Sequence, residues 1–92
     1  MTNSEYKTGH FNTARQYSDN GQPINFKYKT VYVDEFWGFE TEILFHDTAR
    51  GIWAGIKTNI DYDNAPAVET ALIKGYDQNR HYPITTSDYE NA

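Results

Sequence analysis

The chain contains no cysteine. A disulfide framework, a cysteine-ligated zinc site and a thiol nucleophile are therefore excluded, and the fold must be stabilised by packing, within one subunit or against a second one. The chain also lacks any run of 18 or more apolar residues and any basic stretch followed by an apolar segment near Met1. We therefore expect no transmembrane helix, no signal peptide and a cytoplasmic location.

Recognisable catalytic motifs are also missing. The chain has no phosphate-binding loop, no dinucleotide fingerprint and no nucleophile elbow. Residues Asp61–Asn64 begin like a calcium loop, but Pro66 and Leu72 stand where that loop needs a glycine and a bidentate glutamate. This segment is better explained as a turn that caps a helix.

Histidines are the remaining candidates for catalysis, because imidazole titrates near neutrality and binds metals. His10, His46 and His81 are widely separated and form no motif. We therefore expect a protein that is not an enzyme and that binds no metal or cofactor. The alternative, a histidine-dependent enzyme or metal protein, requires His46 and His81 to converge in the fold.

Aromatic residues are abundant, with eight tyrosines, five phenylalanines and two tryptophans among 92 residues. Each can bury about 150–250 Å² of surface, so a few large side chains can form a core. A chain of this length can build one core but not two. We expect a single domain covering residues 1–92.

Three segments show the two-residue alternation of side chains that is typical of a β-strand. They are Ile24–Val33, Phe39–His46 and Ile52–Ile60. Connectors of hairpin length, residues 34–38 and 47–51, separate them. The pattern predicts an antiparallel meander of three strands, or four if one more segment joins it.

One helix is predicted after the strands. Asn64 is a good N-cap and Pro66 fits the first turn, so the helix should begin at Ala65. Gly75 is the expected terminator. An apolar face should lie across the sheet, and it consists of Ala67, Val68, Ala71, Leu72 and Tyr76.

The two ends of the chain are polar. Residues 1–23 indicate a flexible arm in which Asn12–Tyr17 could form a short helix. Residues 77–92 form a polar tail with no clear period, and its last residues should be mobile. The sequence therefore predicts an α+β fold, in which residues 24–76 form a sheet with one helix on one face.

Charge is distributed unevenly. The net charge is −5, but residues up to Val33 carry two acids and four bases, whereas residues from Asp34 onward carry eleven acids and four bases. Such a surface repels nucleic acid and attracts a basic partner. The alternative is that a modest acidic excess only confers solubility.

Carboxylates recur at alternate strand positions. Glu40 and Glu42 should share one face about 6.6 Å apart, which is comparable to, though sparser than, the phosphates of a DNA strand. The expected contacts to a partner are Asp34, Glu35, Glu40, Glu42, Asp47, Asp61, Asp63 and Trp53. Equally, the carboxylates could form the solvated face that antiparallel sheets usually have.

Trp53 is in the strand register that faces away from the predicted helix. It is either a partner or dimer contact, because tryptophan is enriched at binding hot spots, or a residue that the arm or tail covers. A second hypothesis for function is an interaction module or inhibitor that uses an aromatic surface without DNA mimicry, formed by Trp37, Phe39, Trp53 and Tyr62.

In length, acidic composition and lack of cysteine, the whole chain resembles the small phage-encoded anti-restriction DNA mimics, such as the T4-type anti-restriction nuclease protein. The resemblance implies a non-enzymatic inhibitor, often dimeric, in the host cell cytoplasm. Its carboxylates would occupy the DNA-binding surface of a host restriction nuclease or nucleoid protein. Lys27, Lys29, Lys57 and Arg50 would then have to lie off the binding face.

Overall fold

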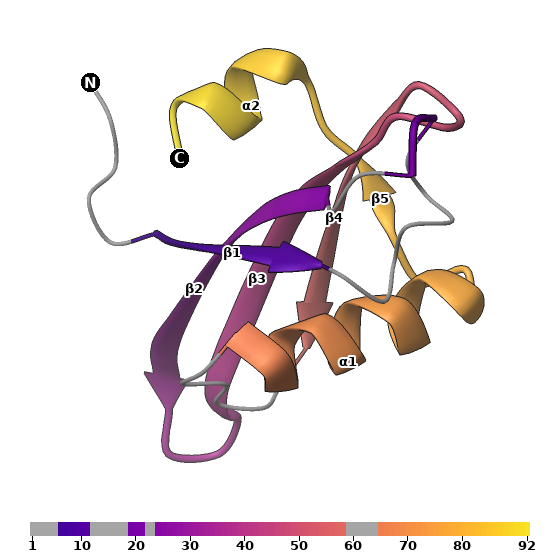
Figure 1. Cartoon of the computed structure of the whole chain (residues 1–92). Helices are drawn as coiled ribbons and strands as arrows, with labels where there is room; N and C mark the ends of the chain where they lie inside the picture. The colour runs from indigo at the N-terminus through magenta and orange to yellow at the C-terminus, as the bar shows by residue number, and fades with distance from the viewer. Residues whose placement is uncertain (1–5, 12–18, 22–23, 59–64) are drawn as a thin grey trace.

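The computed structural model describes residues 6–11, 19–21, 24–58 and 65–92, and its centre is a five-stranded antiparallel sheet with the strands in chain order (Figure 1). The strands are β1 (Lys7–Phe11), β2 (Ile24–Asp34), β3 (Gly38–Asp47), β4 (Ile52–Thr58) and β5 (Tyr82–Pro83), and the helices are α1 (Ala65–Asp77) and α2 (Thr86–Glu90). The α+β class is confirmed, but the expected three or four strands are too few.

The core lies between the sheet and α1. Its buried side chains come from alternate positions of β2, β3 and β4 and from one face of the helix, and they are Ile24, Phe26, Tyr28, Ile43, Phe45, Ala54, Ile56, Val68, Leu72 and Tyr76. The period-two pattern of the strands and the helical face are therefore confirmed. Burial of these apolar side chains is the main contribution to the stability of the fold.

Helix α1 begins at Ala65 as expected; Asn64, the predicted N-cap, lies outside the described residues. The prediction that Gly75 terminates the helix is wrong. Gly75 lies inside α1, where a Cβ atom would be 3.2 Å from Ile56, so it allows close approach to β4. The helix ends in a Schellman motif: Asn79 has a φ of 56°, and the amide of Arg80 donates to the carbonyl of Gly75.

The N-terminal arm contains a strand that the sequence pattern did not predict. β1 pairs with β2 from Lys7 opposite Tyr28 to Phe11 opposite Ile24. Within it, Gly9 leaves room for the ring of Phe26, since a Cβ atom there would lie 2.3 Å from that ring. The part of the arm that forms β1 is thus neither loose nor helical, and the predicted short helix over Asn12–Tyr17 lies outside the described residues.

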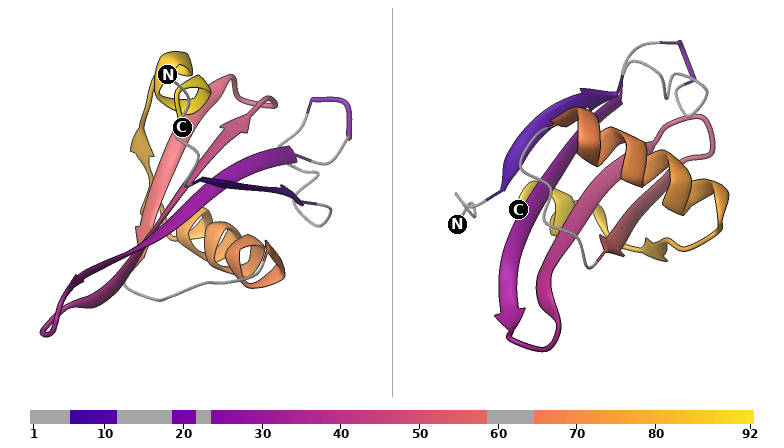
Figure 2. Two further views of the ribbon diagram at one scale, coloured as in Figure 1. Left: turned by 90° about the vertical axis from the view of Figure 1, so that its left-hand side faces the viewer. Right: turned by 90° about the horizontal axis from the view of Figure 1, so that it is seen from below.

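The C-terminal tail is also more ordered than expected. β5 pairs with β4, and α2 begins with a capping box in which Thr85 and Asp88 exchange hydrogen bonds. The ring of Tyr89 lies 5.2 Å from that of Trp53 and attaches α2 to the face of the sheet opposite α1 (Figure 2). No helix within the described ranges is long and apolar enough to cross a membrane.

Candidate functional site

The hairpin formed by β2 and β3 projects away from α1 and the other strands (Figure 2, left). β1 pairs with β2 only as far as Tyr28, and β4 pairs with β3 only from Thr41 onward. Within the described parts of the chain, the outer half of the hairpin therefore has no further strand beside it. It continues as a two-stranded ribbon to the pair Asp34 and Gly38.

This outer half carries a concentrated apolar surface. All the exposed large hydrophobic residues found in the described ranges belong to it, and they are Val31, Tyr32, Val33, Phe36, Trp37 and Phe39. Phe36, at the tip, is 98% exposed, and Trp37 is 49% exposed. We call residues 31–40 the hairpin tip.

Local hydrogen bonding and backbone conformation define the shape of the hairpin tip. The carboxylate of Asp34 accepts a hydrogen bond of 2.6 Å from the amide of Trp37, and Gly38 has the positive φ of 83° that the turn requires. An irregularity in pairing between Tyr32 and Asp34 leaves Val33 without a partner in the register. The rings of Tyr32 and Phe39 pack edge to face across the strands, 5.6 Å apart.

Three of the predicted partner contacts lie in the hairpin tip: Asp34 and Glu35 are exposed, and Glu40 is half-buried. The sequence contains no lysine or arginine between Lys29 and Arg50. The tip therefore combines aromatic and negatively charged side chains.

Glu42, the next predicted contact, lies within a polar cluster on the face of the sheet opposite α1. Its two carboxylate oxygens accept hydrogen bonds from the phenols of Tyr6 and Tyr82, the latter at 2.8 Å. Burial, followed by the hydrogen bond to Glu42, raises the pKa of Tyr82. Lys29 and Lys57 stand opposite Glu42 on the two neighbouring strands. The requirement that these lysines lie off the acidic face is thus not met.

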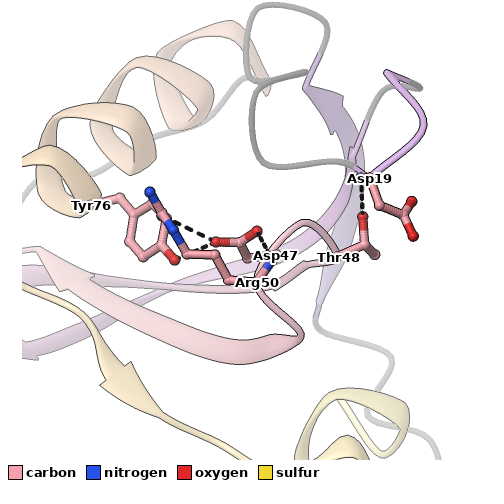
Figure 3. Close-up of polar contacts among 5 residues, drawn as sticks. All are labelled: Asp19, Asp47, Thr48, Arg50 and Tyr76. Atoms are coloured by element: carbon pink, nitrogen blue, oxygen red, sulfur yellow. Dashed lines mark hydrogen bonds and ion pairs between the residues drawn. The ribbon is translucent and has the colours of Figure 1, made fainter.

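Asp47 does not lie on the surface. It is fully buried, and its carboxylate accepts hydrogen bonds from the phenol of Tyr76 and from the backbone and guanidinium of Arg50 (Figure 3). Burial, followed by the bond to Asp47, raises the pKa of Tyr76. In the same region, the amide of Asp19 donates to the hydroxyl of Thr48. The prediction that Asp47 contacts a partner is therefore wrong: it joins α1 to the end of β3.

Trp53 is half-buried rather than free to dock. The imidazole of His46 stacks on it at 3.9 Å with parallel planes, and Tyr89 of α2 covers it as well. Of the two alternatives for Trp53, the structure shows burial by the tail. The remaining predicted contacts, Asp61 and Asp63, and the aromatic candidate Tyr62 lie outside the described residues.

The histidines have separate surroundings. His46 stacks on Trp53, His81 packs edge-on against Tyr76 at 4.6 Å, and His10 is hydrogen-bonded to Asn25. Among the residues that the structure describes, no three His, Asp or Glu side chains are grouped to hold a metal ion. The alternative of a histidine-dependent enzyme thus gains no support from these contacts.

Sequence patterns identified Trp37 and Phe39 as candidates but did not identify Val31, Tyr32, Val33 or Phe36. The available signal was the turn Asp34–Gly38, in which Phe36 and Trp37 occupy positions that usually carry polar residues. Comparison with known proteins adds no further indication, because no family model, curated protein or solved structure matches the chain.

Proposed function

We propose that the protein is a non-enzymatic binding protein that inserts its hairpin tip into an apolar pocket of a protein partner. The observation that carries this proposal is that every exposed large hydrophobic residue of the described chain belongs to one projecting hairpin. Concentrated apolar surface of this kind is typical of interaction sites, and aromatic side chains dominate binding energy at interfaces. Phe36 and Trp37 are the expected anchors.

Charge indicates which partner fits. Asp34, Glu35 and Glu40 accompany the aromatic side chains, so a pocket bordered by lysine or arginine is complementary. A second copy of the chain is a poorer occupant. A symmetric contact between two hairpin tips brings the same carboxylates close to one another, which is unfavourable.

DNA mimicry is the second candidate. It is favoured by the acidic residues of the hairpin tip and by the absence of basic residues between Lys29 and Arg50. A continuous row of free carboxylates is not supported by the contacts of Glu42 and Asp47, which are engaged within the protein. The aromatic surface therefore gives the stronger account, with the acidic side chains as its rim.

Affinity capture with matched variants tests the proposal. Tagged wild-type protein is compared with Phe36→Ser, with Phe36→Leu and with Glu35→Lys, using Glu90→Lys on the exposed side of α2 as the charge control. We expect one bacterial protein to bind wild type and Glu90→Lys but to be lost with Phe36→Ser. Phe36→Leu keeps an apolar side chain but removes the aromatic ring. Binding by non-specific apolar adhesion should therefore be unchanged in this variant, whereas specific docking of the ring should weaken. A capture profile that Phe36→Ser leaves unchanged would contradict the proposal.

Salt and duplex DNA separate the two candidates. Exposed charge pairs are screened over about 8–10 Å at physiological salt, so binding by mimicry falls steeply as salt rises. Docking by aromatic side chains should persist in 0.5 M salt, which is roughly three times the physiological ionic strength. Release of the captured protein by excess duplex DNA, together with insensitivity to Phe36→Ser, would instead support mimicry.

A further inference from the structure

A cavity of about 470 Å³ lies beside the last residues of β4, between that strand, α1 and the base of the hairpin tip. Its lining consists of Trp37, Glu40, Ile56, Lys57, Thr58, Ala71, Lys74, Gly75, Gln78 and Arg80. This volume is within the range of about 300–1,000 Å³ that is usual for small-molecule sites.

Positive charge is concentrated in this cavity. From Asp34 onward the chain has only four basic residues, and three of them line the cavity: Lys57, Lys74 and Arg80. The only carboxylate in the lining as described is that of Glu40. In an acidic protein, this local excess of positive charge favours an anionic ligand.

Among the described residues, no ion pair neutralises the three cations. The ion pair found in the described part of the chain joins Arg50 and Asp47, so Lys57, Lys74 and Arg80 have no carboxylate within 4.0 Å there. Lys57 stands opposite Glu42, whose oxygens accept from two phenols instead, and Arg80 donates only a long bond of 3.4 Å to Gln78. Lys57 shares the face opposite α1 with Glu42, and its ammonium lies 5.7 Å from the centroid of the Tyr82 ring. Lys74 and Arg80 are therefore the side chains available to a phosphate, which both lysine and arginine bind well.

The rest of the lining suits a planar group. Trp37 contributes an aromatic side chain to the lining, and Ile56, Ala71 and Gly75 are its apolar members. Stacking of a base on an aromatic side chain contributes about 1–3 kcal/mol. The hydroxyl of Thr58 is buried with no hydrogen-bond partner in the described residues, which leaves a donor and acceptor beside the cavity.

We infer that this cavity binds a nucleoside phosphate, with the base against Trp37 and the phosphates against Lys74 and Arg80. This inference goes beyond the proposed function. It is tested on the isolated protein without a partner, so that its failure leaves docking by the hairpin tip untouched.

Isothermal titration calorimetry with ADP, adenosine and inorganic pyrophosphate is the test. We expect ADP to bind more tightly than either fragment, with a dissociation constant below about 1 mM. Lys74→Gln should weaken ADP binding about tenfold, because a charge-assisted hydrogen bond is lost, whereas Lys7→Gln on β1 should not. Trp37→Ala should weaken ADP binding but leave pyrophosphate binding unchanged.

Three results would overturn the inference. The first is that ADP gives no saturable heat up to about 5 mM, a concentration well above the largest dissociation constant that we expect. Lys74→Gln could bind ADP as tightly as wild type, with circular dichroism confirming that both are folded. Pyrophosphate could bind as tightly as ADP, in which case the base makes no contribution.

Discussion

The phenol of Tyr76 in α1 donates a hydrogen bond to the fully buried carboxylate of Asp47 at the end of β3. A buried carboxylate is tolerated only when it is hydrogen-bonded, and Arg50 supplies the other donors. This contact fixes the end of the helix on the sheet. It also explains why an acidic residue predicted to meet a partner is unavailable to one.

Tyr76→Phe is predicted to lower the free energy of unfolding by about 1–3 kcal/mol, because it leaves a buried acceptor with one donor fewer. Urea denaturation followed by circular dichroism measures the change. Tyr32→Phe is the matched control: its ring is exposed on the hairpin tip, so the change should stay within about 0.5 kcal/mol. Equal effects of the two substitutions would show that the Asp47 contact contributes nothing.

Glu42→Gln should destabilise the protein by about 1–2 kcal/mol, since a charged acceptor of two phenol hydrogen bonds is lost. Glu40→Gln, two residues earlier on the same face, should change the free energy of unfolding by less than about 0.5 kcal/mol. Thermal and urea unfolding of the two variants provide the comparison. If Glu40→Gln is the more damaging substitution, the assignment of Glu42 as the centre of the polar cluster is wrong.

Stability should fall at alkaline pH. Burial is the main cause that raises the pKa of Tyr76, Tyr82 and Tyr89 in the folded protein. Tyrosines of the unfolded chain lose their protons near pH 10, while these three remain protonated, so ionisation favours unfolding. The stabilisation is complete below about pH 10 and is lost as the pH rises above it.

Urea unfolding at pH 8 and pH 11 measures this loss of stability. Tyr82→Phe should reduce the difference between the two pH values, because one of the linked tyrosines is removed. The same difference in wild type and Tyr82→Phe would contradict the role of Tyr82.

Thr85→Ala should loosen α2 without unfolding the sheet. Loss of an N-cap side chain costs about 1 kcal/mol, which corresponds to roughly fivefold faster amide exchange in this helix. Exchange measured by NMR at Tyr89 and Asn91, whose amides donate to Thr85 and Ser87, reports the change. Amides of β3 should exchange as in wild type, and unchanged exchange at both α2 positions would contradict the capping box.

The central fold could be predicted because its signals are local and periodic. Alternation along β2 to β4 and the apolar face of α1 both reflect burial on one side of an element. β1, β5 and α2 could not be predicted in this way, since each has two to five residues and depends on tertiary contacts. Gly75 was misread because a glycine that permits close packing and one that ends a helix look the same in sequence.

The candidate site was only partly predictable. The acidic character of Asp34, Glu35 and Glu40 is visible in the sequence, but burial of Asp47 and the phenol contacts of Glu42 depend on residues about 30 to 40 positions away. The exposure of Phe36 could not be predicted from the sequence either. Alternation indicates where a strand lies, not where a hairpin extends beyond the rest of the sheet.

Hydrogen–deuterium exchange on the complex with the captured partner tests the central claim most directly. The account predicts new protection at residues 31–40 and little change over α2. If residues 31–40 gain no protection and the protected amides lie elsewhere on the described surface, docking by the hairpin tip is contradicted.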